Sequence, residues 1–436
     1  MNYTVGGVVG RILLHPEQTT LATPSLCGKL IPMFDRVQTR WHVFVGRLMG
    51  KMGCYHSASR QFQSALAIFP RHLVAQCLLG WSLDRLQQHT EALSAFDQAL
   101  QIAPDSPFAH LYKGRSWACL GKYQDAADSL NRAFRIQPKF ASDPHYLETL
   151  AQCYCHLNQV EKALEVYSTA ERLAPENGEF AYRVGWALTR LERYSDAEQP
   201  LRRAISISPS NANARYDLGV TLYNLKRYQE SIEMYRTVVA LSPSRADAHI
   251  AIGIVNKDQG CFPEAAAEFE EALRVEPENS EPYLQLSVLH ADNGEWQKAL
   301  DASRRLVELR PQAEVSYLAM AGACQELKLY KEEIEACNQA LCINPDSLPS
   351  LEGLAWALLH TEKFDEAVSV LTRAVKMSPG VPYFHAWLAH AYAKLGNLQA
   401  AAREQAVLEK LDPQLAADVE KTIQEKMRAK DISRPT

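Results

Sequence analysis

The sequence predicts an all-α fold, an α-solenoid of stacked antiparallel helix hairpins. Two observations lead to this prediction. Proline recurs at a fixed spacing along most of the chain, and small residues recur in phase with it. Because sequence periods of about 20–50 residues are typical of repeat architectures, the period indicates the fold class before any single helix is considered.

The prolines keep one phase over most of the chain. Every interval between neighbours is 34 residues, except one of 37 residues between Pro138 and Pro175. The eleven prolines in phase are Pro70, Pro104, Pro138, Pro175, Pro209, Pro243, Pro277, Pro311, Pro345, Pro379 and Pro413. Proline cannot continue a helix, so each one marks the end of a helical segment.

Small residues follow the same phase at two places in each period. The residue 24 before each proline is always small. These residues are Gly46, Gly80, Gly114, Ala151, Gly185, Gly219, Gly253, Ser287, Ala321, Ala355 and Ala389. The residue 12 before each proline is alanine in nine of eleven cases, and of the exceptions, Ser231 and Glu333, only Glu333 is large.

One period illustrates the physical reason for the pattern. Segments Leu73–Leu86 and Thr90–Ile102 carry apolar residues at helical spacing, so two helices are predicted. Gly80 and Ala92 lack bulk and allow the two helices to approach closely, while Phe96 fills the space beside them. A single hairpin leaves one apolar face bare, so neighbouring hairpins must stack.

The pattern resembles the tetratricopeptide repeat (TPR) family over residues 39–415. The shared features are a small residue at position 8, an aromatic residue at 17, alanine at 20 and proline at 32. The resemblance implies a right-handed superhelix of eleven TPR repeats. The expected starts lie near residues 39, 73, 107, 144, 178, 212, 246, 280, 314, 348 and 382.

The two ends and one connection depart from the repeat. We expect residues 1–38 to form an N-terminal arm or cap that is not repeat-like. Residues 416–436 are expected to form a C-terminal capping helix with a frayed tail. The three extra residues of the long interval lie in Lys139–Asp143. They are expected to lengthen a connecting turn before an N-cap at Asp143 and a first-turn Pro144.

Composition excludes several classes of function. The 46 basic and 51 acidic residues leave a net charge of −5, too mild to indicate a nucleic-acid partner. The N-terminus is a poor signal peptide, and no run approaches the roughly 18 apolar residues of a membrane span. We therefore expect a cytoplasmic protein, with the ten cysteines present as free thiols.

No catalytic motif is found, so we expect a protein that is not an enzyme and uses no cofactor. The patterns GxxxxGK[ST], GxSxG and HExxH are all absent. Cys153, Cys155, His156 and His145 come nearest to a metal cluster. Packed thiols and a surface histidine are the favoured interpretation, because a zinc site needs four convergent ligands.

By the resemblance, positions 2, 5, 9, 12 and 13 of each first helix face the inner, concave surface. In the first five repeats these positions carry mostly basic residues, opposed by Asp84, Glu148 and Glu179. The basic residues are Arg40, Arg47, Lys51, Arg85, Arg115 and Arg190. Repeats seven to nine carry acids there, opposed by Lys257 alone. The acids are Asp247, Asp258, Glu281, Asp292 and Glu326.

Such a division of charge along the inner face would orient a charged partner. The alternative is that the charges are distributed at random over a solvated surface.

Aromatic residues at these positions gather in repeats five and six. They are Tyr182, Trp186, Tyr216 and Tyr223, with Arg190 and Asn224 beside them. They serve either as a binding anchor or as packing between first helices, and packing is favoured for Trp81 and Trp356. The chaperone-type carboxylate clamp is not expected, because its lysine and asparagine slots hold Val43 and Arg47.

These observations predict a non-catalytic scaffold or adaptor that binds a peptide, a helix or several proteins in its groove. The alternative is a regulatory or assembly subunit of a separate enzyme or secretion complex. A weaker alternative is a helical-repeat protein that binds RNA, which the irregular and partly acidic face disfavours. No small-molecule substrate is expected.

Overall fold

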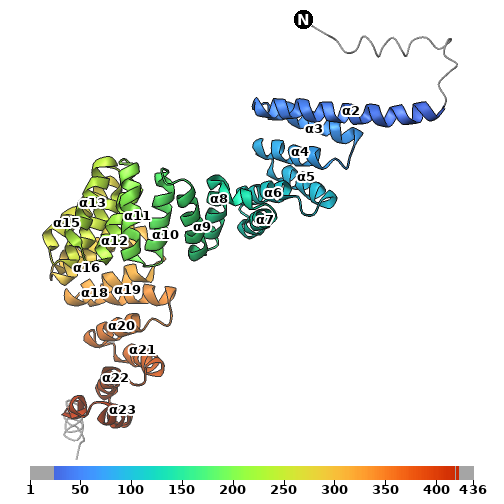
Figure 1. Cartoon of the computed structure of the whole chain (residues 1–436). Coiled ribbons are helices and arrows are strands. Elements are labelled where there is room, and N and C mark those ends of the chain that lie inside the picture. The colour runs from blue at the N-terminus through green and yellow to red at the C-terminus, as the bar shows by residue number, and fades with distance from the viewer. Residues whose placement is uncertain (1–23, 418, 422–436) are drawn as a thin grey trace, which may run out of the picture. The chain divides into compact units, whose positions relative to one another are not determined.

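The computed structural model describes residues 24–417 and 419–421, and the side chains from residue 35 onward apart from that of residue 418. All the secondary structure within this range is helical, which confirms the predicted all-α fold. The chain forms two compact units, Met1–Asp217 and Leu218–Thr436. Figure 1 shows the helices following one another as hairpins in chain order.

The first unit contains five helix pairs and one short 3₁₀-helix among its described residues. They are α2 (Pro24–Lys51), α3 (Tyr55–Ile68), α4 (Leu73–Arg85), α5 (His89–Ile102), α6 (Pro107–Cys119), α7 (Tyr123–Ile136), η1 (Pro138–Ser142), α8 (Pro144–His156), α9 (Val160–Leu173), α10 (Gly178–Arg190) and α11 (Tyr194–Ile207). Each helix packs on the next one along the chain, and the first helices α2, α4 and α6 also contact the first helix of the following pair.

Helix α12 (Ala212–Asn224) contains the division between the units. The second unit continues with the same alternation of first and second helices. They are α13 (Tyr228–Leu241), α14 (Ala246–Asp258), α15 (Phe262–Val275), α16 (Ser280–Asp292), α17 (Trp296–Leu309), α18 (Glu314–Glu326), α19 (Tyr330–Ile343), α20 (Leu348–His360), α21 (Phe364–Met377), α22 (Pro382–Lys394) and α23 (Leu398–Leu411).

The turn inside each hairpin is made by one residue in the left-handed region. Its φ angle lies between 56° and 79° at the eleven such residues described. They are Gly53, Gln87, Gly121, Asn158, Glu192, Lys226, Gly260, Gly294, Lys328, Glu362 and Gly396. At the first non-glycine turn, the amide of Gln88 donates to the carbonyl of Leu83 at 3.0 Å. The bond satisfies a carbonyl that the helix end would otherwise leave open.

The close approach predicted within each hairpin is present. A Cβ atom added to any of six glycines would lie 2.5–2.7 Å from a side chain of the paired second helix. The pairs are Gly46–Phe62, Gly80–Phe96, Gly114–Leu130, Gly185–Leu201, Gly219–Tyr235 and Gly253–Phe269. The side chains 12 residues before the prolines are also fully buried, from Ala58 through Glu333 to Ala401. Small residues therefore set the distance between the two helices.

The connection that carries the three extra residues behaves as predicted. The segment Pro138–Ser142 forms the 3₁₀-helix η1, and α8 begins directly after it at Pro144. The side chain of Asp143 accepts a hydrogen bond from the amide of His145 at 3.0 Å and caps α8. The insertion lengthens the turn and leaves the flanking helices whole.

The ends of the chain differ in how much of them is described. Helix α2 begins at Pro24, well before the repeat start expected near residue 39, so the first helix is longer than a repeat helix. After α23, residues 413–417 and 419–421 are helical, and Ala416 and Val419 pack in an apolar cluster with Leu408. The expected N-terminal arm before residue 24 and the frayed tail after 421 lie outside the described residues. The domain boundaries and the number of repeats stay predictions.

Among the described helices, none is long and apolar enough to cross a membrane.

The Gly253→Ala substitution is expected to lower the stability of the second unit by about 2 kcal/mol, because overpacking a filled core forces side chains from their rotamers. The new Cβ would lie 2.5 Å from the buried ring of Phe269. Denaturation by urea, followed by far-UV circular dichroism, measures the change.

Gly322→Ala provides the matched control on α18 in the same unit. A Cβ atom at Gly322 meets nothing within 4 Å among the described residues. Alanine should therefore raise stability by up to about 1 kcal/mol through helix propensity. Equal effects of the two substitutions would contradict the close-approach argument.

Candidate functional site

Five of the six predicted basic residues, all except Arg115, lie at the surface of the first unit. Arg47 is exposed on α2, and Arg85 and Arg190 are exposed at the ends of α4 and α10. The guanidinium of Arg85 lies 5.3 Å from the ring centre of Tyr55, and that of Arg190 lies 5.9 Å from Trp186. These cations are held over aromatic faces yet remain accessible to a partner.

Arg115 has a different environment, because it neutralises a buried acid. Asp84 is 4% exposed and accepts a hydrogen bond from Arg115 Nε at 3.0 Å. Ser116 Oγ donates to the same carboxylate at 2.9 Å, and His89 Nδ1 lies 3.0 Å from it. The prediction that Asp84 is an acid of the inner surface is therefore wrong, since a saturated buried carboxylate offers nothing to a partner.

The aromatic residues predicted for repeats five and six differ in burial. Tyr182 is 9% exposed, and its burial, followed by the negative charge of Asp217, raises its pKa to about 12. Trp186 and Tyr216 are half-buried and keep part of their rings at the surface. The Tyr182 ring is therefore mostly buried, whereas Trp186 and Tyr216 are partly exposed, and the role of these residues as anchors stays a prediction.

Tyr223 and Asn224 belong to the second unit. The hydroxyl of Tyr223 donates to Asp258, and this bond, followed by burial, raises the tyrosine pKa to about 12. The side chain of Asn224 donates to the carbonyl of Val220 at 2.9 Å within its own helix. A joint aromatic anchor across repeats five and six stays a prediction, because its members lie in two units.

The predicted acids of the second unit also have different partners. Asp247 pairs with Arg245, whose Nε donates at 3.0 Å. Asp258 accepts from Tyr223, and Asp292 is exposed on α16. Asp292 thus presents a solvated carboxylate, whereas the other two acids already have a partner within the protein.

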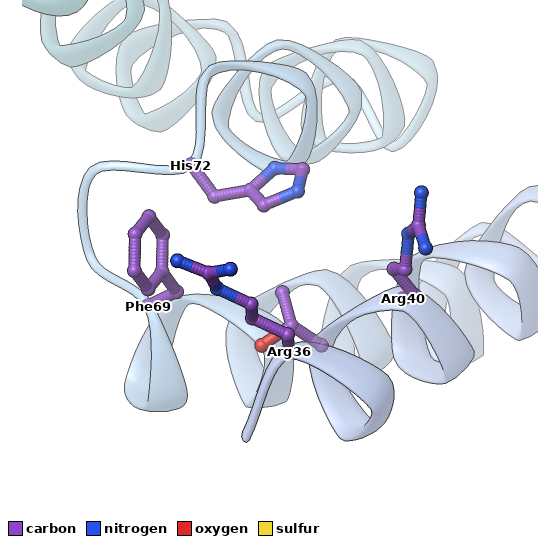
Figure 2. A pocket seen from close by; sticks show the side chains of 5 residues that line it. Arg36, Arg40, Phe69 and His72 are labelled. Atoms are coloured by element: carbon purple, nitrogen blue, oxygen red, sulfur yellow. The ribbon is translucent and has the colours of Figure 1, made fainter. Parts of the chain in front are cut away.

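A basic cavity of about 380 Å³ lies between α2 and the turn that leads into α4. Figure 2 shows Arg36 and Arg40 projecting from α2 beside Phe69 and His72. His72 caps α4 by accepting a hydrogen bond from the amide of Ala75 at 3.1 Å. Both arginines are exposed, so the cavity is an open basic corner of the first hairpin.

Helix α2 and the residue that follows it carry a row of exposed apolar side chains at steps of three and four residues. They are between 51% and 70% exposed. The residues are Val37, Trp41, Phe44, Leu48 and Met52. Large exposed apolar patches often mark interaction sites, so this row is a candidate contact surface.

The residues considered as a metal cluster are used in packing. Cys153 is buried, and the ring of His156 stacks on Tyr123 with 4.1 Å between centroids. The Sγ atom of Cys155 lies 3.9 Å from the hydroxyl of Tyr167. Within the described part of the chain no group of three or more histidine, cysteine or acidic residues could hold a metal.

Glu333 is a buried acid that has no hydrogen-bond partner in the described part of the chain. It lies on α19, is 0% exposed, and neither carboxylate oxygen has a hydrogen-bond partner among the described residues. Burial raises the pKa of this carboxyl from its usual 4.5 to about 7. An isolated buried carboxylate is costly, so Glu333 is a candidate for a ligand-binding group.

A pocket of about 260 Å³ adjoins Glu333 in the second unit. Helices α18, α19, α20 and α22 contribute its lining. The lining residues are Leu318, Ala321, Gly322, Gln325, Glu333, Cys337, Pro349, Glu352, Gly353, Trp356 and Trp387. Most of them occupy positions 2, 5, 9 and 12 of first helices, the positions predicted to face the inner surface.

Three departures from the repeat pattern meet in this pocket. Glu333 replaces the usual alanine, while Gly322 and Gly353 are glycines at positions where most other repeats carry larger residues. A Cβ atom on Gly353 would lie 3.0 Å from Cys337 Sγ and 3.8 Å from Glu333 Oε1. The carboxylate therefore lies against Gly353, in space that the small residues leave open.

The sequence contains one sign of this pocket, but the sign alone does not predict a binding site. Glu333 stands out as the one large residue at its position in the period, but the same exception is compatible with a tolerated surface charge. Only the structure shows that the side chain points between helices.

Glu333 makes the stability of the second unit depend on pH. Its pKa near 7 lies above the usual 4.5, so the folded chain binds an extra proton between these values. Stability therefore falls as pH rises through this window, by about 3 kcal/mol, and stays low above it. Three other titratable groups face the site, the thiols of Cys324 and Cys337 and the carboxyl of Glu352, and burial keeps both thiols protonated.

Glu333→Ala is expected to remove this dependence. Compared with the unchanged chain, the variant should gain stability at pH 8 and gain little or lose stability at pH 5, where only the lost packing counts. Urea midpoints measured at both pH values test this. An identical pH dependence in the two chains would contradict the assignment.

Asp84→Ala is the matched comparison, because it removes a buried acid that has partners. This change should lower stability by about 3 kcal/mol near neutral pH, since it leaves Arg115 without its counter-charge. At pH 8 we therefore expect Glu333→Ala to raise the free energy of unfolding and Asp84→Ala to lower it.

Comparison with known families gives matches along most of the described chain. A family described as "Tetratricopeptide repeat" matches residues 46–107, 250–314 and 353–416, and a second one of the same description matches 188–253. The family "Psidin, N-terminal TPR repeats region" matches residues 81–216. Together the matches cover residues 46–314 and 353–416.

Similar proteins share only part of their length with this chain. "Anaphase-promoting complex subunit 7" of Dictyostelium discoideum is 28% identical over 124 residues, which are 28% of this chain and 21% of that protein. "Tetratricopeptide repeat protein 16" of Mus musculus is 28% identical over 139 residues, 30% and 17% of the two chains. The crystal structure of the C-terminal part of a TPR repeat-containing protein from Cytophaga hutchinsonii gives a TM-score of 0.48 at 16% identity, covering 56% of this chain and 99% of that one.

Proposed function

Because the chain belongs to the tetratricopeptide-repeat family, we propose that it is a non-catalytic scaffold or adaptor that binds protein segments along the inner face of its first helices. The occupant is an extended peptide, a helix or several proteins at once. The proposed inner face comprises positions 2, 5, 9, 12 and 13 of each first helix.

One observation carries the proposal. Side chains suited to protein recognition remain accessible at these positions, although the rest of each hairpin is closely packed. In the first unit Trp186 is half-buried, with the exposed guanidinium of Arg190 5.9 Å from its ring centre. Tryptophan, tyrosine and arginine are the residues that most often dominate binding energy in interfaces.

The second candidate is a regulatory or assembly subunit of an enzyme made by another chain. The name of one relative, a subunit of the anaphase-promoting complex, supports this candidate. The two candidates differ in the number of partners, because a subunit has one dominant partner and an adaptor has several. RNA binding is a weaker candidate, since Asp247, Asp258 and Asp292 oppose a polyanion.

Replacing Trp186 and Tyr216 together by alanine is expected to weaken capture of the partner at least about tenfold, because both rings would be lost from the binding face. Affinity capture with the full chain, followed by mass spectrometry, identifies the partners, and titration with the partner so identified measures the loss. Circular dichroism checks that the double variant keeps its helices.

Arg202→Ala is the matched surface control for this experiment. Arg202 lies on the second helix α11, where its side chain is 45% exposed and pairs with Glu198. Its loss should leave capture unchanged. Equal capture by the double variant and by the unchanged chain would exclude Trp186 and Tyr216 as anchors, and recovery of RNA in place of protein would overturn the proposed function.

A further inference from the structure

We propose that the pocket around Glu333 binds the guanidinium group of an arginine side chain. The pocket is built from α18, α19, α20 and α22 within the second unit. No basic residue is among its described lining residues, so no cation from the described part of the chain lines it.

The buried carboxylate supplies the first reason. Glu333 is fully buried, and both its oxygens lack hydrogen-bond partners among the described residues. Its Oε1 atom would lie 3.8 Å from a Cβ atom on Gly353, which also lines the pocket. A carboxylate can accept about four hydrogen bonds, and leaving them unmade away from water is costly. A positively charged hydrogen-bond donor that enters the pocket would satisfy these oxygens and neutralise their charge.

The remaining walls favour a cation over a neutral donor. Glu352 brings a second carboxylate, which accepts a hydrogen bond from the hydroxyl of Tyr383 at 3.2 Å. Trp356 and Trp387 also line the pocket, with ring centroids 5.5 Å apart and planes inclined at 50°. Indole faces attract cations, and two acids beside them add to the negative potential.

The size and chemistry of the pocket favour guanidinium. A space of about 260 Å³ is smaller than the usual pocket for a drug-sized ligand, and suits one side chain. Guanidinium is planar, is more weakly hydrated than ammonium, stacks on aromatic rings and binds carboxylates with two parallel hydrogen bonds. In the proposed complex the arginine enters beside Gly322, which is exposed, and its guanidinium binds Glu333 alongside the indoles that line the pocket.

The source of the arginine is a segment of the protein partner, and this assignment rests on the proposed function. Six of the eleven lining residues lie at first-helix positions that were assigned to the partner-binding face. A partner segment laid along this face would present side chains to it in succession, and one arginine would fill the pocket.

Binding should also depend on pH. A guanidinium ion favours the ionised carboxylate, so it has to displace the proton that burial retains on Glu333. Affinity is therefore expected to rise between pH 5.5 and pH 8. The facing thiols of Cys324 and Cys337 remain neutral over this range, and Glu352 is the other acid that faces the pocket.

Calorimetric titration of the full chain with N-acetyl-arginine amide tests the proposal. N-acetyl-citrulline amide has nearly the same shape without the charge, and should bind at least about tenfold more weakly. Glu333→Gln keeps the size of the side chain and removes its charge. It should lower the affinity for the arginine amide at least about tenfold and abolish the rise with pH.

Gly322→Leu is a second variant, which fills the mouth of the pocket and leaves Glu333 unchanged. It should also abolish binding, and it serves if Glu333→Gln fails to fold. The proposal is overturned if arginine and citrulline amides bind equally, if lysine amide binds more tightly than arginine amide, or if methylguanidinium binds while the arginine amide does not.

The outcome is separable from that of the proposed function, because the probes are small molecules and need no protein partner. Binding of the arginine amide without any captured protein would support the pocket and count against the scaffold. Capture of a protein by a chain that ignores the arginine amide would support the scaffold and overturn the pocket.

Discussion

The close approach of the two helices in each hairpin is the constraint on which the rest of the structure depends. A glycine or another small residue on the first helix lies against a ring or a leucine on the second, as Gly80 lies against Phe96 and Gly253 against Phe269. Because each hairpin covers its apolar side only with its neighbours, this distance also sets the spacing of the stack. The side chains on the accessible face of the first helices are then free to vary without disturbing the core.

The chain contains two ways of dealing with a buried acid. Asp84 is neutralised by Arg115 and further satisfied by Ser116 and His89. Glu333 receives none of this and keeps an elevated pKa instead. The first arrangement is a structural ion pair of the kind that many proteins retain. The second is unfavourable for the folded chain alone, which is why it points to a function outside the chain.

The fold followed from the sequence because the period repeats many times, and each repetition has the same steric meaning. The site did not follow in the same way, since exposure depends on how each side chain is accommodated by its neighbours. At the same position of the period, Ser231 is satisfied by donating to the carbonyl of Gly219 at 2.7 Å, whereas Glu333 is not satisfied. Asp84 and Asp292 are the same residue type, but the side chain of Asp84 is buried and that of Asp292 is exposed to solvent.

In a linear array of repeats, folding is cooperative only between adjacent repeats. A weakened repeat therefore divides the array into blocks that can unfold separately. The hairpin that carries Glu333 has this character above neutral pH, where its carboxylate is ionised. Local unfolding at α18–α20 and binding of a cation in the pocket would then oppose each other. A partner that inserts its cation there would fasten two blocks of the array together, and so would change the rigidity of the chain as well as becoming attached to it.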